Sequence, residues 1–232
     1  MIYLCCESST LLGSVAVFKD EQLLFFKESH RQGSHSDVLN VFVKQVLAEA
    51  ELALSQVDLF VAGVGPGSFT GIRISLNAIK TFAFCFDKPV LGIDSLQNLA
   101  SQQSGAKLPI VAMINAYKNM VYIGTYKFVG SELITAREPS VVRVQNLENY
   151  LTEKSIVVGD GYMAYSKYFS EPLSNLIVRP EAASDNPTAQ KMGFLIQRNA
   201  KKETHWSQLL PVYLRSSEAE ENQQGIKYQP LE

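Results

Sequence analysis

The order of the predicted elements repeats once along the chain, and this repeat constrains the fold more than any other feature of the sequence. In the first half, apolar runs typical of strands lie at residues 2–6, 14–18, 23–29 and 59–65, and a helical pattern lies at 36–52. In the second half, strand patterns lie at residues 108–116, 120–128, 132–140 and 155–161, and a helical pattern lies at 144–154. Each half is therefore predicted to form a β-β-β-α-β unit.

A further helix follows each unit, and the two units meet at a polar linker. The additional helical patterns lie at residues 71–84 and 188–202, and the glycine-containing segment 103–107 separates the two halves. A duplicated unit of this kind is typical of the actin-like ATPases, an α/β fold with two ribonuclease-H-like subdomains. We therefore predict an N-terminal subdomain at residues 1–104, a C-terminal subdomain at 105–215, and an acidic, flexible tail at 216–232.

The composition is that of an ordinary globular chain without a strong charge. Hydrophobic residues make up 46% of the chain, charged residues 19%, and the formal net charge is −2, so the chain alone is not expected to attract RNA. The longest apolar runs, such as 108–114, are too short to cross a bilayer, and the N-terminus lacks the basic region of a signal peptide. Cys5, Cys6 and Cys85 form no recognised motif and are predicted to be reduced and buried. These features predict a cytoplasmic protein that does not contact a membrane.

The segment GVGPGSFTGIR, residues 63–73, has the glycine content of a phosphate-binding loop but not its pattern. A P-loop continues as Gly-Lys-Ser/Thr, whereas here Ile72 and Arg73 follow Gly71. We predict instead that the segment turns the chain into a helix that begins near Gly71, with Ser68 or Thr70 as its cap and a packed aromatic ring beside it. The predicted structural loop comprises Gly63, Gly65, Pro66, Gly67, Ser68, Phe69, Thr70 and Gly71.

In an actin-like ATPase the first hairpin carries an acidic residue and small residues that hold phosphate and magnesium. This chain has Glu7, Ser8 and Ser9 at that hairpin. A second acid would complete the magnesium site at the end of the second subdomain's first strand, but Asn115 stands there without a charge. We therefore interpret Glu7, Ser8, Ser9 and Asn115 as a degraded nucleotide site, and we predict no catalytic residue.

The histidines do not predict a metal site. His30 and His35 are five residues apart with a glycine between them, as H-R-Q-G-S-H. That spacing does not place two ligands on one face of a helix, as a zinc or iron site would require. We expect loop histidines that hold no metal.

Two helices carry an apolar stripe in addition to the one that should face their own sheet. On the 71–84 helix the second stripe comprises Ile74, Ala78, Thr81 and Cys85, and on the 36–52 helix the additional apolar residues are Val38 and Val41. Such stripes favour contact with the helices of another chain, although burial beneath this chain's own second subdomain remains an alternative. Arg73 is unusual because a cation in the first turn of a helix opposes the helix dipole, so either an anion compensates it or it is simply solvated.

Several segments together resemble the TsaB (YeaZ) family. They are the strand that ends in Glu7-Ser8-Ser9, the segment GVGPGSFTGIRI, and the later segments PVLGIDSLQNLA at 89–100, INAYKNMVYIGTY at 114–126 and PVYLR at 211–215. The resemblance extends from residue 1 to 215. This chain departs from the family where Glu7 replaces the usual aspartate and where Asn-Ala-Tyr at 115–117 replaces Asp-Ala-Arg.

The resemblance implies a non-catalytic subunit that binds and supports TsaD. TsaD is the metal- and ATP-binding subunit that transfers threonylcarbamoyl to adenosine 37 of tRNA, and the ATPase TsaE joins them. The implied partner surface comprises Val38, Val41, Gln45, Arg73, Ile74, Asn77, Ala78, Lys80 and Thr81. The resemblance further implies a homodimer in the absence of TsaD, contact with tRNA only through the complex, and no cofactor in this chain alone, with ATP or ADP in TsaD or at the boundary between the subunits.

Three other functions remain open from the sequence. The first is a small-molecule kinase or ATPase of the actin-like fold, which would have to bind magnesium and ATP by itself. The second is a metallopeptidase-like protein, which would need a metal site. The third is a self-associating stability factor without a part in tRNA modification.

Overall fold

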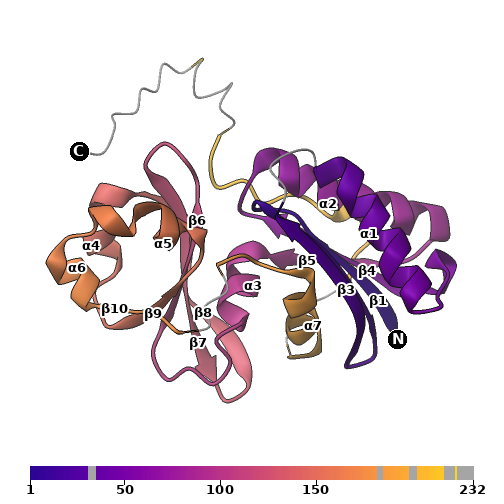
Figure 1. Ribbon diagram of the computed structural model, residues 1–232, viewed down its shortest axis with the longest axis horizontal. Coiled ribbons are helices and arrows are strands. Elements are labelled where there is room, and N and C mark those ends of the chain that lie inside the picture. The colour runs from indigo at the N-terminus through magenta and orange to yellow at the C-terminus, as the bar shows by residue number, and fades with distance from the viewer. Residues whose placement is uncertain (31–34, 182–184, 199–202, 217–222, 224–232) are drawn as a thin grey trace.

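The computed structural model describes residues 1–30, 35–181, 185–198, 203–216 and 223 of the chain (Figure 1). Two α/β lobes lie side by side along the long axis, and each is built on a five-stranded mixed sheet. The prediction of a duplicated α/β fold is therefore confirmed. Within the described residues, no helix combines the length and the apolar composition needed to span a membrane.

The first sheet has the strand order β3-β2-β1-β4-β5. Its strands are β1 (Ile2–Glu7), β2 (Leu12–Lys19), β3 (Gln22–His30), β4 (Leu59–Gly65) and β5 (Val90–Asp94). The strands β1, β2 and β3 are antiparallel, whereas β1, β4 and β5 are parallel. Because side chains alternate along a strand, the adjacent Cys5 and Cys6 point into cores on opposite faces of the sheet.

Helices cover both faces of the first sheet. On one face lie α1 (His35–Glu49) and α2 (Phe69–Phe86), whose apolar residues join the core that contains Cys6. On the other face lie α3 (Ser95–Ser101) and α7 (Ala189–Arg198), which join the core that contains Cys5. Short 3₁₀ turns are η1 (Leu54–Gln56) and η4 (Trp206–Gln208).

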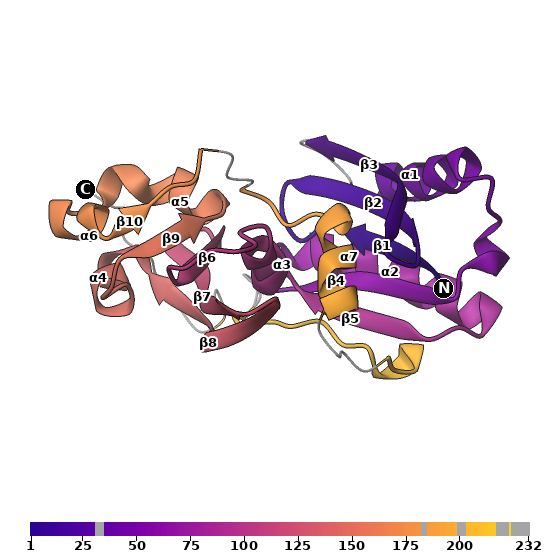
Figure 2. The same ribbon diagram turned by 90° about the horizontal axis from the view of Figure 1, so that it is seen from below.

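The second sheet has the order β10-β9-β6-β7-β8. Its strands are β6 (Ile110–Asn115), β7 (Met120–Val129), β8 (Glu132–Arg143), β9 (Ser155–Val158) and β10 (Ile177–Val178). Its outer face packs on α4 (Leu147–Tyr150), α5 (Asp160–Tyr165) and α6 (Glu171–Asn175), with 3₁₀ turns at η2 (Val144–Asn146) and η3 (Ser166–Tyr168). Its inner face shares one core with the first sheet, and α3 and α7 lie between the two lobes (Figure 2).

Three predicted boundaries were wrong, each for a local reason. The helix predicted at 144–154 is a 3₁₀ turn followed by the single turn of α4, and the strand predicted at 155–161 ends at Val158 because Gly159 takes a positive φ of 114° before α5 begins. The helix predicted at 36–52 ends at Glu49, and Glu51 then takes a left-handed φ of 54°. The short elements β5, α3, α5, α6 and β10 escaped prediction because so few residues cannot establish a periodicity.

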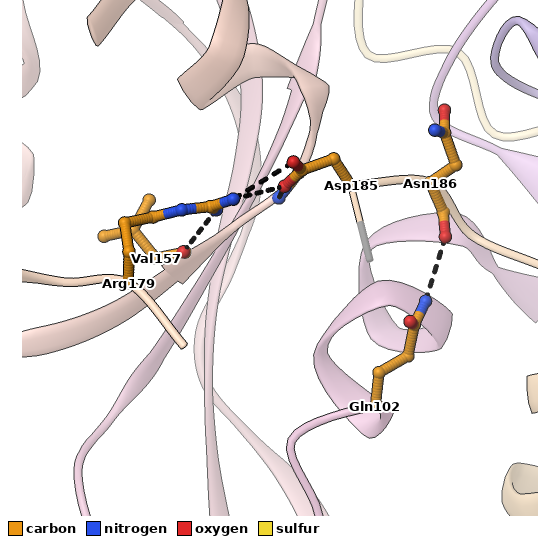
Figure 3. A network of polar contacts seen from close by, with 6 residues as sticks. Gln102, Val157, Arg179, Asp185 and Asn186 are labelled. Atoms are coloured by element: carbon orange, nitrogen blue, oxygen red, sulfur yellow. Dashed lines mark hydrogen bonds and ion pairs between the residues drawn. The ribbon is translucent and has the colours of Figure 1, made fainter. Parts of the chain in front are cut away.

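One crossing between the lobes is held by polar contacts (Figure 3). The Arg179 guanidinium donates to the Val157 carbonyl at 2.8 Å and to the Asp185 carboxylate at 2.9 and 3.0 Å, all within the second lobe. On the first-lobe side, Gln102 Nε2 donates to the Asn186 carbonyl at 2.9 Å. Residues 185–186 therefore carry the chain from the second sheet to helix α3.

The segment that follows α7 also returns to the first lobe. We call residues 203–216 the C-terminal strap. Thr204 and Val90 exchange two backbone hydrogen bonds of 3.0 and 2.9 Å, and the Val212 amide donates to the Val64 carbonyl at 2.8 Å. Helix α7 and the strap thus pack on the first lobe, although both fall in the segment 105–215 that was predicted as the C-terminal subdomain. Of the predicted tail 216–232, only Ser216 and Gln223 lie within the described residues.

Candidate functional site

The glycine loop lies directly against the first hairpin loop. The Ser68 amide donates to the Ser9 carbonyl at 2.6 Å, and the Ser8 hydroxyl donates to the Gly71 carbonyl at 2.8 Å. A Cβ atom at Gly71 would overlap the Ser8 carbonyl oxygen, and one at Gly67 would overlap that of Ser9. The two segments therefore approach so closely that neither Gly67 nor Gly71 leaves room for a side chain.

Glu7 is enclosed behind this contact. Its side chain is fully buried, Oε1 accepts from the Ser9 amide at 2.8 Å, and Oε2 accepts from the Ser95 hydroxyl at 3.4 Å. A Cβ at Gly63 would overlap the carboxylate. Burial raises the pKa of Glu7, against the opposing effect of its hydrogen bonds with Ser9, Ser8 and Ser95. The carboxylate is therefore fixed inside the protein, where it organises the hairpin loop.

Helix α2 begins at the end of the glycine loop, and Ser68 rather than Thr70 caps it. The Ser68 hydroxyl accepts from the Gly71 amide at 3.3 Å. The predicted packing of Phe69 is also observed, because its ring stacks on Tyr213 of the strap with centroids 4.4 Å apart. Four of the loop residues, Gly67 to Thr70, border a cavity that is described below.

Arg73 and Lys80, the two cations on α2, both donate hydrogen bonds to residues of the strap. The Arg73 guanidinium lies 3.9 Å from the centre of the Phe69 ring, and its Nε donates to the Tyr213 hydroxyl at 3.1 Å. Lys80 Nζ donates to the Leu209 carbonyl at 3.1 Å. The sector of α2 that carries these cations therefore faces the chain's own strap at its edge.

The predicted partner residues divide by exposure. Val41 is 50% exposed, and Gln45, Arg73, Asn77 and Thr81 are also exposed, whereas Val38, Ile74, Ala78 and Lys80 are half-buried. Ile74 and Ala78 pack against the edge of the first core. The outer faces of α1 and α2 thus present a mixed surface with apolar groups that no described element fully covers.

Two exposed apolar residues extend this surface and were not predicted. Phe84 is 66% exposed and meets Trp206 edge to face at 5.3 Å, and Leu210 is 68% exposed. The helical wheel would have indicated Phe84, because it follows Lys80 by four residues on the same face. The prediction that all three cysteines are buried was wrong for Cys85, which is exposed on α2.

Asn115, the fourth member of the predicted nucleotide site, lies at the end of β6 in the second lobe. The Asn115 side-chain Oδ1 accepts from the Tyr117 backbone amide at 2.8 Å and from the Tyr165 hydroxyl at 3.1 Å. The backbone amide of Asn115 donates to Asp160 Oδ1 at 2.8 Å. Burial, with the nearby Asp185 charge, raises the pKa of Asp160 to about 6, against the lowering effect of the hydrogen bond from Asn115. Asn115 borders the cavity described below, whereas Glu7, Ser8 and Ser9 are buried.

A cavity of about 490 Å³ lies where the two lobes meet. The beginning of α2, the turn after β6 and the end of the strap form its walls. Among the described residues, no three His, Cys, Asp or Glu side chains are grouped closely enough to hold a metal ion. The side chains of His30 and His35 lie outside the described residues.

Comparisons by sequence and by structure both find that the chain is similar to TsaB (YeaZ) proteins. Residues 29–223 match the family model described as "TsaD: tRNA N6-adenosine threonylcarbamoyltransferase". The chain is 25% identical to the tRNA threonylcarbamoyladenosine biosynthesis protein TsaB of Bacillus subtilis, over 95% of this chain and 96% of the relative. It is 30% identical to TsaB of Buchnera aphidicola from Schizaphis graminum, over 69% and 79%.

Solved structures agree with these relatives. The crystal structure of a Pseudomonas aeruginosa protein with similarity to peptidase YeaZ superposes with a TM-score of 0.78 at 28% identity, over 92% of this chain and 99% of that one. The structure of YeaZ from the same organism superposes with a TM-score of 0.74, also at 28% identity and over the same shares of the two chains. The fold predicted from the duplicated element order, a pair of ribonuclease-H-like subdomains, is thereby confirmed.

Proposed function

Since this chain belongs to the TsaB (YeaZ) family and so takes part in the biosynthesis of threonylcarbamoyladenosine in tRNA, we propose that it is the non-catalytic subunit that binds TsaD. In this proposal TsaD performs the transfer of threonylcarbamoyl to adenosine 37 of tRNA. The chain described here stabilises TsaD in its active arrangement and contributes no catalytic group.

The close contact between the first hairpin loop at Ser8 and Ser9 and the glycine loop is the observation that carries the proposal of a non-catalytic role. A phosphate-binding hairpin needs open backbone amides and an acid that can reach a metal. In this chain the Ser68 amide already donates to Ser9, and Glu7 is fully buried. Opening this site would break the contacts of Gly67 and Gly71 with the hairpin, which supports the proposal that no nucleotide binds there.

The outer face of α1 and α2 supports the proposal of a partner surface. Val41, which is half exposed, lies on α1, and the half-buried Ile74 and Ala78 lie on the neighbouring helix α2. Two adjacent helices with apolar groups on their outer face fit the packing of helices from a second subunit. The homologous TsaD would supply such helices, and in its absence a second copy of this chain would pair through the same face.

The remaining parts of the proposal concern the assembly. TsaE joins the pair, tRNA binds through the complex, and ATP or ADP binds in TsaD or at the boundary between the subunits. This chain alone requires no cofactor, and the assembly works in the cytoplasm.

A binding experiment with a matched control tests the partner surface. Val41→Glu places a charge at a half-exposed position of the proposed surface on α1, and we expect the dissociation constant for TsaD, measured by calorimetry, to rise at least tenfold, which corresponds to about 1.4 kcal/mol. Val129→Glu makes the same change at a 61% exposed position at the end of β7 on the second lobe. We expect this control to bind as the unchanged chain does.

A reconstituted modification assay tests the role in the reaction. We expect TsaD to modify tRNA in the presence of the unchanged chain or of Val129→Glu, and to lose most of that activity without the chain. Full activity of TsaD in the absence of this chain would refute the supporting role. Turnover of ATP by the isolated chain would refute the non-catalytic role and favour a kinase or ATPase instead.

A further inference from the structure

A second cavity, of about 200 Å³, lies on the outer face of the second sheet, and it shares no described lining residue with the interlobe cavity. Thr125 of β7 borders it together with its two cross-strand partners, Val111 of β6 and Arg137 of β8. Tyr150, the last residue of α4, and the chain that follows it form the remaining wall. The cavity is therefore built from the second lobe alone.

The buried hydroxyl of Tyr150 is the unusual feature of this cavity. Tyr150 is only 6% exposed, and its hydroxyl oxygen has no hydrogen-bond partner among the described residues. Burial raises the pKa of Tyr150, so the hydroxyl keeps its proton at neutral pH. The Thr125 side chain and the Arg137 charge oppose this shift, but Thr125 does not reach hydrogen-bonding geometry. Because a buried donor without an acceptor is unfavourable, an acceptor that enters the cavity would stabilise this group.

Arg137 is held beside Tyr150. Its guanidinium carbon lies 3.7 Å from the centre of the Tyr150 ring, and its Nη1 donates to the Tyr150 carbonyl at 3.0 Å. Within the part of the chain that the structure describes, no carboxylate pairs with this guanidinium. A guanidinium carries five N–H donors, so the donors that remain can bind an anion in the cavity.

The other two charged residues that line the cavity pair with each other. Lys127 Nζ lies 3.4 Å from Glu153 Oε1, and their side chains are 46% and 63% exposed. With these two charges cancelled, Arg137 leaves the described wall with one positive charge. A ligand with a single negative charge would therefore neutralise the cavity.

The wall also offers apolar surface beside these donors. Val111 and Leu151, which are 2% and 5% exposed, both border the cavity. A carboxylate has two oxygens that can accept from a guanidinium and from a hydroxyl at the same time. The cavity is also larger than a single water molecule needs, so it has room for a short hydrocarbon group attached to the carboxylate.

We propose that this cavity binds a small monocarboxylate anion. The carboxylate oxygens accept from the Arg137 guanidinium and from the Tyr150 hydroxyl, and the hydrocarbon part lies against Val111 and Leu151. Binding in this way satisfies the buried hydroxyl and joins β8 to the end of α4. It is independent of the proposed pairing with TsaD, which uses α1 and α2 of the first lobe.

A nuclear magnetic resonance titration of the full chain with sodium butyrate tests this proposal, with sodium chloride at the same ionic strength as the reference. We expect the Arg137 Nε–H signal and the Tyr150 ring signals to shift saturably with butyrate and to give one common dissociation constant. The constant should lie in the millimolar range, because a ligand of so few atoms cannot bind much more tightly.

Two variants and a matched control identify the groups that bind. Tyr150→Phe removes only the hydroxyl, and we expect the dissociation constant for butyrate to rise at least fivefold. The midpoint of urea unfolding should stay the same or rise, since the hydroxyl has no described partner to lose. Arg137→Gln should raise the dissociation constant at least tenfold. Arg143→Gln changes an exposed arginine of the same strand that does not border the cavity, and it should bind butyrate as the unchanged chain does.

Weaker binding by Tyr150→Phe and Arg137→Gln, with unchanged binding by Arg143→Gln, supports the proposal. Shifts that do not saturate, or equal shifts with chloride, would overturn it. Unchanged affinity of Tyr150→Phe would also overturn it and leave an internal water as the partner of the hydroxyl. A lower unfolding midpoint of Tyr150→Phe would count against it as well, because it would reveal a partner within the chain.

Discussion

At the scale of single residues, the glycines of the 63–71 loop matter because an added Cβ atom would overlap neighbouring atoms. Gly71 lies in the first turn of α2, where an alanine would ordinarily favour the helix by about 1 kcal/mol. Here its Cα faces the Ser8 carbonyl, whose backbone cannot move away without disturbing β1 and β2. Steric overlap with the hairpin should therefore outweigh helix propensity at this position.

Gly71→Ala tests this balance. We expect the free energy of unfolding to fall by about 1–3 kcal/mol, the usual cost of inserting a group into a packed site, and urea denaturation measures it. Gly130→Asn is the control, because Gly130 has no neighbouring atom within 4 Å of an added Cβ and its φ of 60° suits asparagine. An equal or higher stability of Gly71→Ala would show that the two loops are not in tight contact.

At the scale of elements, the strap determines how α2 is held. It contacts the helix near its beginning through Tyr213, in its middle through the Leu209 carbonyl and near its end through Trp206. It also pairs with the ends of β4 and β5 through backbone hydrogen bonds of Val212 and Thr204. The helix that carries six of the nine proposed partner residues is therefore held by the strap and by α1.

Tyr213→Ala removes the contact at the beginning of α2. The change deletes an aromatic stack and a hydrogen bond to Arg73, and we expect a loss of about 1–2 kcal/mol. Hydrogen exchange should show the Val212 amide, which donates to Val64, exchanging at least tenfold faster. Tyr168→Ala is the control, because Tyr168 has the same 39% exposure and lies in the second lobe. Unchanged exchange at Val212 would mean that Tyr213 does not anchor the strap.

At the scale of the whole molecule, the two lobes share one core. Tyr3 and Ile93 of the first sheet, and Ile110 and Val158 of the second, belong to the same buried cluster. Helix α7 contributes Ala189, Met192 and Leu195 to that cluster, although it follows the second sheet in the sequence. The lobes are thus expected to unfold together, since separating them would expose this core to water.

A fragment of residues 1–104 tests that expectation. It contains the whole first sheet but lacks α7 and the strap, so both faces of the sheet lose apolar cover. We expect the fragment to show no cooperative urea transition, whereas residues 1–216, which keep every described core residue, should unfold in one transition. A cooperative transition of the fragment at the same midpoint would show instead that the first lobe folds independently.

The sequence by itself determined the features that depend on neighbouring residues. Apolar runs indicated the strands other than β5 and β10, and a period of 3.6 indicated α1, α2 and α7. Ser68 was one of the two residues predicted to cap α2. These signals are local, because backbone geometry and burial on one face act within a few residues. The failed match to a P-loop likewise indicated a turn, which the structure contains.

Tertiary structure alone decided the contacts between residues far apart in the chain. Arg73 meets Tyr213 across 140 residues, and Ala189 donates to the Ser14 hydroxyl across 175. The burial of Glu7 and the return of the strap to the first lobe are of the same kind. Such contacts leave no periodic pattern in the sequence, because they arise when separate elements fill one shared core and each finds its partner only in three dimensions.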